Sequence, residues 1–253
     1  MKITSLMLAG LLAVGAAAGQ AHAKDWDKIR IGIEAAYPPF NGYNTNKELI
    51  GFDVDIAEAL CAQMKAECTL VAQDWDGIIP ALLAGKYDAI VSSMSITEER
   101  QQVVDFTDRY YTNSLTFVAP KDTAITDVSP AGMAGKTLGA QSSTVSAAHL
   151  EEEYKDATIK LYPTQDDAYL DLASGRVDAV LADVGPTNLW LDAEDGACCA
   201  FVGEAVVKDD EIGIAIRKDD GDLKAKFNEA LAAILADGTY ETISAKYFPF
   251  SIY

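Results

Sequence analysis

Beyond its first 23 residues, the sequence contains no apolar run long enough to cross a bilayer, because a spanning helix needs about 20 consecutive apolar residues. It also contains no basic segment. Its 39 acidic residues outnumber 20 basic ones, for a formal net charge of −19. These two absences argue against stable membrane insertion and against binding to nucleic acid or anionic lipid through bulk charge.

Residues for catalysis and metal binding are scarce as well. Histidine occurs only at His22 and His149, and no cysteines have the C-x-x-C spacing of a zinc site. The G-x-S-x-G, H-E-x-x-H, P-loop and dinucleotide-binding motifs are all absent, and His149 has no evident nucleophile as a partner. We therefore expect no hydrolase, no metal and no cofactor.

The first 23 residues have the pattern of a secretory signal peptide. A positive start at Lys2 precedes an almost wholly apolar or small stretch over residues 3–19, and residues 21–23 form an A-x-A cleavage site. A membrane anchor is the alternative, which the richness in small Ala and Gly disfavours. We predict export to the periplasm and a mature chain that starts at Lys24.

The four cysteines are Cys61, Cys68, Cys198 and Cys199. Export makes disulfides plausible, and four cysteines allow three pairings. Cys61 and Cys68 can pair only if the helix predicted from residue 51 ends between them, because seven residues of helix would separate their Cα atoms by about 10 Å. The adjacent Cys198 and Cys199 could form a vicinal disulfide, stay as thiols or link two chains.

Two stretches of the sequence are nearly the same. Residues 83–91 (LAGKYDAIV) recur as residues 173–181 (ASGRVDAVL). Each indicates a helix end, a capping Gly, a basic-x-Asp turn and a buried strand. The strands lead into a serine-rich segment, residues 92–95, and into Asp183. Since ligands of open α/β sheets bind beyond the carboxyl ends of strands, the repeat predicts two similar lobes that face a cleft.

The order strand-helix-strand-helix-strand occurs twice, which predicts an α/β fold of two lobes, each a mostly parallel sheet flanked by helices. We place lobe 1 at residues 24–112 plus 212–253 and lobe 2 at residues 118–206. Extended runs at 113–117 and 207–211 are the predicted hinge, which would let the lobes close on a small ligand. The expected elements are strands at 29–34, 68–71, 88–92, 136–141, 159–162 and 179–182, and helices at 51–66, 77–84, 97–103, 145–154, 165–173, 222–235 and 239–247.

Several polar side chains at these strand ends suit a zwitterion. The planar guanidinium of Arg100 can hold a carboxylate in a bidentate fashion, although a surface pair with Glu98 or Glu99 is the alternative. Ser143 and Thr144 start a helix, where free N–H groups attract an anion, although plain capping is the commoner role.

The other candidates suit positive charge and apolar bulk. Asp183 and Glu34 each end a nearly apolar strand, so a ligand ammonium and a second, distal cation would satisfy them. Tyr37 and Trp75 could flank a ligand side chain through apolar burial and cation–π attraction, or could be ordinary core aromatics.

Five segments, residues 37–40, 51–55, 75–82, 88–100 and 238–240, resemble the periplasmic solute-binding proteins of polar amino-acid ABC importers. The similarity is closest to the lysine/arginine/ornithine- and histidine-binding group and extends over the mature chain. It implies that Arg100 and Thr144 hold the α-carboxylate and Asp183 the α-ammonium. It further implies that Tyr37 and Trp75 flank the side chain and that Glu34 meets the distal cation. It also implies a bridge between Cys61 and Cys68. The full predicted ligand-binding set is Glu34, Tyr37, Trp75, Ser92, Ser93, Met94, Ser95, Arg100, Ser143, Thr144 and Asp183.

The resemblance implies a monomeric protein that binds an amino acid without chemistry and delivers it to a membrane permease. Arginine, lysine, ornithine and histidine are the expected ligands. An opine stays open because Val145 stands where relatives often carry Gln. Two different functions also stay open: a periplasmic dehydratase on the same scaffold, with Glu34 as the proton-transfer group, and a sensor module. The Cys198–Cys199 region is not a feature of the resemblance.

Overall fold

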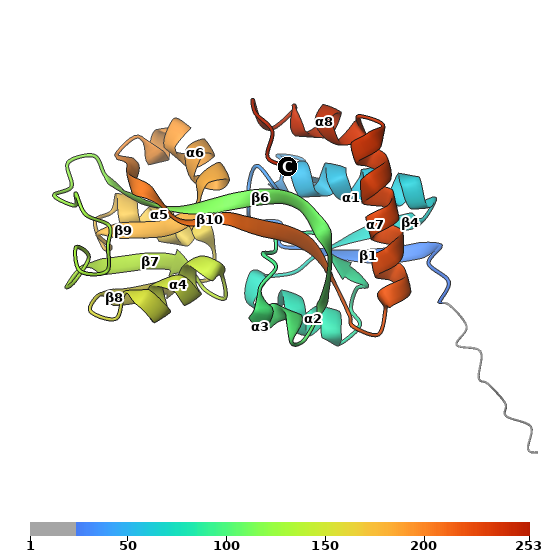
Figure 1. Ribbon diagram of the computed structural model, residues 1–253. Helices are drawn as coiled ribbons and strands as arrows, with labels where there is room; N and C mark the ends of the chain where they lie inside the picture. Colours follow the sequence, from blue (N-terminus) through green and yellow to red (C-terminus); the bar gives the residue numbers. More distant parts are fainter. Residues whose placement is uncertain (1–23) are drawn as a thin grey trace, which may run out of the picture.

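The computed structural model describes residues 24–253, so the predicted signal peptide lies outside the described residues. The chain forms two lobes, joined by two long strands (Figure 1). Lobe 1 is built on the parallel strands β1 (Lys28–Ile33), β4 (Glu67–Ala72) and β5 (Ala89–Ile90). Its helices are α1 (Phe52–Met64), η1 (Trp75–Gly77), α2 (Ile78–Leu83), α3 (Glu98–Gln101), α7 (Gly221–Ala236) and α8 (Thr239–Ser244).

Lobe 2 repeats this design. Its parallel strands are β7 (Thr137–Gln141), β8 (Thr158–Tyr162) and β9 (Ala179–Asp183). Its helices are α4 (Val145–Glu153), α5 (Gln165–Ala173), α6 (Val184–Asp192) and the short η2 (Glu194–Gly196). In each lobe a hydrophobic cluster lies on both faces of the sheet. In lobe 1, helices α1 and α7 cover one cluster and α2 covers the other. In lobe 2, α4 covers one cluster and α5 covers the other.

The two strands that join the lobes are β6 (Asp105–Pro120) and β10 (Cys199–Ile216), which pair antiparallel. They merge the lobes into one eight-stranded sheet of order β4-β1-β5-β10-β6-β9-β7-β8. We expected a mostly parallel sheet in each lobe and two crossings between the lobes; the structure adds that β6 and β10 make the two sheets continuous. The predicted hinge segments fall inside β6 and β10, where the register shifts on both sides of Val207. The lobe boundaries at residues 112, 118, 206 and 212 stay predictions.

The sequence repeat forms the same structure twice. Gly85 and Gly175 have φ of 74° and 71°, the left-handed conformation that a glycine adopts without steric cost. The aspartate three residues after each glycine accepts a backbone N–H from the first strand of its lobe. Asp88 accepts the N–H of Arg30 at 3.0 Å, and Asp178 accepts the N–H of Thr137 at 2.7 Å. In each lobe the basic-x-Asp turn therefore ties the buried strand that follows it to the neighbouring first strand of the sheet.

Helix α1 ends between Cys61 and Cys68, at Met64, and Lys65 follows in the left-handed conformation. The two cysteines are bridged, with Cα atoms 6.1 Å apart. Cys198 and Cys199 are also bridged. The hairpin of β2 (Gly42–Tyr43) and β3 (Leu49–Ile50) and helix α6 were not expected, and α3 is shorter than the helix predicted over 97–103.

Candidate functional site

A narrow cavity lies between the lobes, at the carboxyl ends of the parallel strands. Both lobes contribute to it, as the repeat predicted. Its walls are polar and carry more acidic than basic groups. The lining residues are Glu34, Tyr37, Trp75, Ser92, Ser93, Ser95, Arg100, Gln141, Thr144, Val145, Ser146, Gln165 and Asp183.

Arg100 lies at one end of the cavity, on the short helix α3. Thr97 caps the start of this helix, because its side chain accepts the backbone N–H of Arg100. The guanidinium donates to the carbonyl of Ser95 at 2.9 Å and to the carbonyl of Ser143 at 3.0 Å, and lies 5.4 Å from the centre of the Trp75 ring. Burial lowers its pKa to about 10. No ion pair with Glu98 or Glu99 forms among the described residues. Of the five guanidinium N–H groups, those not directed at carbonyls are free for a carboxylate.

The start of α4 faces the same end of the cavity. Thr144 caps this helix by accepting the Ala147 N–H at 3.1 Å, and it donates to the Gln141 carbonyl at 2.7 Å. Val145 and Ser146 of the first turn also line the cavity. Ser143 does not line it. Its hydroxyl instead donates to Asp76 of lobe 1 at 2.7 Å.

Asp183 ends β9 on the lobe 2 side, where the hydroxyl of Tyr37 donates to its carboxylate from lobe 1. Burial raises the pKa of Asp183 well above its usual range, and the negative charges of Asp210 and Glu34 add to the effect. No cationic side chain pairs with Asp183 in residues 24–253. A cation placed beside this carboxylate would therefore relieve an unbalanced buried charge.

Glu34 occupies the other end of the cavity, directly after β1. It is 8% exposed, and Nε2 of Gln141 in lobe 2 donates to its carboxylate at 2.6 Å. Burial raises the pKa of Glu34 to about 7, and the charges of Asp53, Asp166 and Asp74 act in the same direction. This carboxylate is poised to ionise fully when a cation approaches.

Two glutamines of this end were missed from the sequence. Gln141 is the last residue of β7, the first strand of lobe 2, and Glu34 directly follows β1, the first strand of lobe 1. This equivalent position at a strand end was the sequence signal that could have identified Gln141. Gln165 is 5% exposed and starts α5, and its Nε2 has no hydrogen-bond partner. Their amide groups add hydrogen-bonding capacity beside the Glu34 carboxylate.

The serine-rich segment, residues 92–95, is hydrogen-bonded to a buried carboxylate that the sequence analysis did not single out. Asp53 of α1 is fully buried and accepts hydrogen bonds from Ser93 Oγ at 2.9 Å, Tyr110 Oη at 2.7 Å and Asn41 Nδ2 at 2.8 Å. Ser93 adopts a φ of 50°, which this network stabilises. The signal for Asp53 was an acidic residue on the apolar face of a predicted helix.

The remaining residues of the segment have different surroundings. Ser92 Oγ accepts the backbone N–H of Glu34 at 2.9 Å, and Ser95 Oγ donates to Asp210 at 2.8 Å. Met94 was predicted as a ligand-binding residue, but its fully buried side chain belongs to a lobe 1 core cluster and does not line the cavity. Met94 therefore belongs to the core of lobe 1, although three serines beside it line the cavity.

Hydrogen bonds cross between the lobes at both ends of the cavity. At the Arg100 end, Trp75 Nε1 and the guanidinium share the Ser143 carbonyl, and Asp76 accepts from Ser142 and Ser143. Elsewhere in the cavity, Gln141 of lobe 2 donates to Glu34 of lobe 1, and Tyr37 of lobe 1 donates to Asp183 of lobe 2. The structure is therefore a closed form in which the site residues of both lobes face one another.

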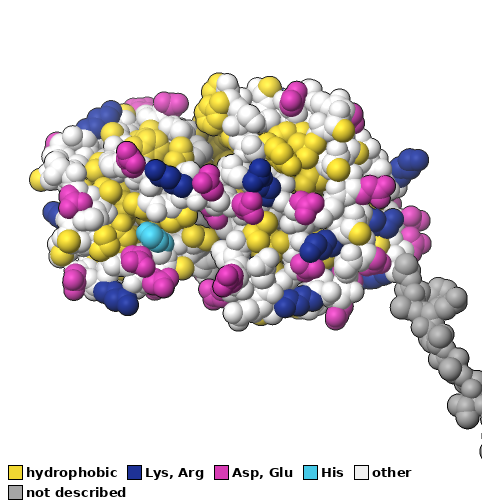
Figure 2. Space-filling model, in the orientation of Figure 1, with side chains coloured by type: hydrophobic (Ala, Val, Ile, Leu, Met, Phe, Trp, Pro, Cys, Tyr) yellow, Lys and Arg dark blue, Asp and Glu magenta, His cyan; other side chains and the backbone are white. Residues whose placement is uncertain are grey.

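The rest of the described chain offers neither a metal centre nor a membrane span. Within residues 24–253, no group of three or more His, Cys, Asp and Glu side chains is arranged to hold a metal ion, and no helix has the length and apolarity to span a membrane. On the face drawn in Figure 2, basic side chains are scattered singly among acidic ones, without a continuous basic patch.

Comparison with known proteins agrees with this geometry. The chain is 42% identical to the L-arginine-binding protein of Pseudomonas aeruginosa, over 98% of both chains. It is 40% identical to ABC transporter arginine-binding protein 1 of Escherichia coli K12, over 96% of this chain and 98% of the relative. The solved structure of an ancestral arginine-binding protein bound to arginine superposes with a TM-score of 0.83 at 35% identity, over 90% of this chain and all of that one. Residues 29–250 match the model of the bacterial extracellular solute-binding proteins, family 3, and the chain belongs to that family.

Proposed function

We propose that this protein binds a cationic amino acid, such as arginine, lysine, ornithine or histidine, by closure of its two lobes. The observation that carries the proposal is the order of charges along one cavity. The charge of Asp210 acts on both Arg100 and Asp183, and the charge of Glu34 acts on Asp183. We infer that Asp183, which has no cationic partner, lies between the Arg100 guanidinium and the Glu34 carboxylate. That order matches the carboxylate, ammonium and side-chain cation of such a ligand.

Each ligand group then has a partner. Arg100 and the N–H groups at the start of α4 hold the α-carboxylate, because both supply donors and positive potential. Asp183 holds the α-ammonium. Trp75 and Tyr37 flank the aliphatic part of the side chain, and Glu34 meets the distal cation. The serine hydroxyls complete the hydrogen bonding on the lobe 1 side.

The proposal includes the cellular context. The named relatives are binding proteins, one of them of an ABC transporter. We propose that this chain acts as a monomer in the periplasm after removal of residues 1–23 and passes its ligand to an ABC-type permease, without catalysing a reaction. We also propose that β6 and β10 flex at residues 113–117 and 207–211, since their ladder is irregular there.

An opine is the second candidate, and Val145 in the cavity wall is the observation that keeps it open. An opine carries an additional carboxylate arm. The distal end of the cavity disfavours such a group because Glu34 is buried there and Asp166 raises its pKa further. The structure therefore favours a cationic ligand over an opine.

Isothermal titration calorimetry on the mature chain, freed of bound ligand by unfolding and refolding, tests the proposal. Arginine, lysine, ornithine, histidine, glutamine and octopine are the titrants. We expect micromolar or tighter binding of at least one cationic amino acid, weaker binding of glutamine, and a smaller radius of gyration in solution scattering when the ligand is present. Flat titrations with all four cationic amino acids would refute the proposal, and tight octopine binding alone would move it to the second candidate.

A further inference from the structure

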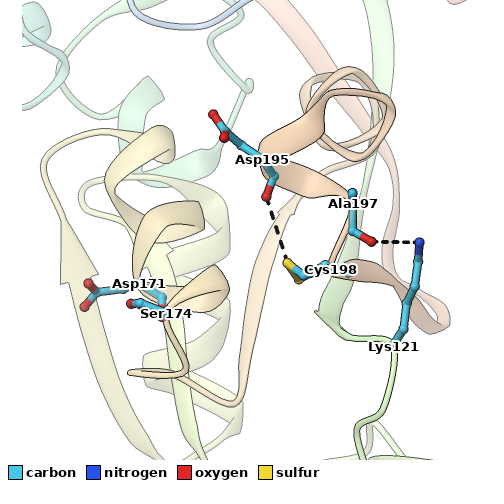
Figure 3. The surroundings of a disulfide bond; sticks show 7 residues. Lys121, Asp171, Ser174, Asp195, Ala197 and Cys198 are labelled. Carbon is cyan, nitrogen blue, oxygen red and sulfur yellow. Dashed lines mark hydrogen bonds between the residues drawn. A yellow bond between two sulfur atoms is a disulfide. The ribbon is translucent and has the colours of Figure 1, made fainter.

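The adjacent cysteines of lobe 2 differ sharply in their surroundings. Cys198 is exposed, while Cys199, the first residue of β10, is 2% exposed and belongs to the hydrophobic cluster that packs against α5. The Sγ atom of Cys198 lies 3.9 Å from the carbonyl oxygen of Asp195 in η2 (Figure 3). One sulfur of the bridge therefore belongs to an exposed residue and the other to a residue in the core of lobe 2.

This bridge contributes little to holding the fold together. A disulfide stabilises a protein mainly by restricting the unfolded chain, and the effect grows with the length of the closed loop. Cys61 and Cys68 close a loop between α1 and β4, whereas adjacent residues close no loop. Other bonds already fix this backbone. The N–H of Lys121 donates to the Cys198 carbonyl at 2.9 Å, and Lys121 Nζ donates to the Ala197 carbonyl at 2.9 Å (Figure 3).

The same bridge is predisposed to open. The Cα atoms of adjacent residues are 3.8 Å apart, below the usual range of about 4.4–6.8 Å for disulfide partners, and such constrained bonds are more easily reduced. Exposed disulfides are also the ones that exchange with thiols, because attack requires access to a sulfur. Cys198 offers that access, and Cys199 does not.

We propose that Cys198–Cys199 is a thiol–disulfide exchange site whose substrate is a dithiol. A thiolate of the dithiol attacks Sγ of Cys198 and forms a mixed disulfide, while the original S–S bond breaks and Cys199 leaves and takes up a proton. The second thiol of the reagent then attacks the mixed disulfide, releases Cys198 and becomes a disulfide itself. The pair gains two electrons and two protons in total.

The reduced state fits its surroundings. Cys199 becomes a neutral buried thiol, which behaves as a small apolar side chain, and Cys198 becomes an exposed thiol with the Asp195 carbonyl available as an acceptor. The bridge follows η2, whereas Asp183 precedes α6, and neither cysteine lines the ligand cavity. Exchange would thus leave the amino-acid site intact, and this proposal does not depend on the proposed function.

Redox titration of the mature protein tests it. The protein, purified without reductant, is equilibrated with stepped ratios of reduced to oxidised dithiothreitol, trapped with N-ethylmaleimide and mapped by peptide mass spectrometry. The pair Cys61–Cys68 is the internal control. We expect Cys198 and Cys199 to be half labelled at a ratio at least about tenfold lower than Cys61 and Cys68, with the far-ultraviolet circular dichroism unchanged. Joint reduction of both pairs, loss of structure on selective reduction, or labelling before any reductant would each overturn the proposal.

Two matched variants test the asymmetry on which the exchange depends. In Cys199→Ser, the remaining Cys198 should react with N-ethylmaleimide in the native protein. In Cys198→Ser, the remaining Cys199 should react only after denaturation. Equal native reactivity of the two thiols would show that solvent reaches both sulfurs and would contradict the assignment of Cys198 as the attacked atom.

Discussion

The pH dependence of arginine binding should report directly on Glu34. The pKa of this carboxyl is about 7 in the structure because it is buried among other carboxyls. A guanidinium placed beside it favours the ionised form, so its pKa falls on binding. Affinity is therefore full only well above pH 7 and is lost as the pH falls through the pKa of the free site. Between pH 7.5 and pH 5.5, this loss amounts to about 20-fold, since each pH unit below that pKa costs close to tenfold.

Comparison of ligands separates Glu34 from the other carboxyls. Asp183 also has a raised pKa, but in the proposed binding mode it holds the α-ammonium that every amino acid carries. Any loss due to Asp183 therefore affects arginine and glutamine alike. The ratio of the arginine and glutamine dissociation constants, measured by calorimetry at each pH, isolates the contribution of Glu34.

The variant Glu34→Gln supplies the control. It removes a charge-assisted hydrogen bond of about 1.5–3 kcal/mol and should weaken arginine about 10- to 150-fold at pH 7.5, with little effect on glutamine. The ratio of the two constants should then be independent of pH. A ratio in the wild type that does not change between pH 5.5 and pH 7.5, or a pH-dependent ratio in Glu34→Gln, would refute the assignment of the distal cation to this carboxylate.

Three further predictions concern the rest of the molecule. Arg100→Ala should cost about 2–5 kcal/mol with every amino acid, because the shared carboxylate loses its charged partner; calorimetry that shows a loss for arginine but not for glutamine would contradict this role. Asp76→Ala should weaken arginine and glutamine by the same factor, about fivefold, since Asp76 bonds only across the lobes and stabilises closure; unequal losses would place Asp76 in contact with the ligand. Replacing Cys61 and Cys68 by Ala should lower the free energy of unfolding in urea by about 2.5 kcal/mol, as expected for so short a loop; an unchanged midpoint would show that the bridge does not restrict the unfolded chain.

The repeated unit was predictable because its signals are local. Gly85 and Gly175 end their helices, and the aspartate three residues later accepts a backbone N–H from the first strand in both lobes. Helix α5 begins and ends where its sequence indicates, since Thr164 caps it and Gly175 follows it. The helix ends depend on residues within one turn of each helix, whereas the aspartate contacts join segments that are 58 and 41 residues apart.

The long strands were not predictable for the opposite reason. Only short parts of β6 and β10 carry an apolar pattern, and residues such as Asp108 and Arg109 do not suggest a strand. Their extended conformation comes from the ladder between two segments about a hundred residues apart, such as the pairing of Asp105 with Ile216. Propensity does not contain that information.

Charged site residues were easier to find than neutral ones. A buried carboxylate or guanidinium at a strand end demands a partner, so Glu34, Asp183 and Arg100 attracted attention from sequence alone. Gln141 and Gln165 create no such demand, and only the fold shows that they face the cavity. Met94 shows the reverse error, because a segment rich in site residues also contains a side chain that belongs to the core.

Charge balance in the closed cavity explains why a cationic ligand is favoured over other amino acids. Arg100 and Asp210 attract each other, which partly offsets the effect of burial on the pKa of each group. Glu34 and Asp183 then stay without a counter-charge, and burial raises the pKa of both carboxyls. A neutral amino acid brings one cation and one anion, so it adds no net charge to offset these two carboxylates. A cationic amino acid brings a second positive charge to the Glu34 end, whereas the extra carboxylate of an opine would add to the imbalance. Selectivity thus follows from the net charge that the lobes enclose on closing.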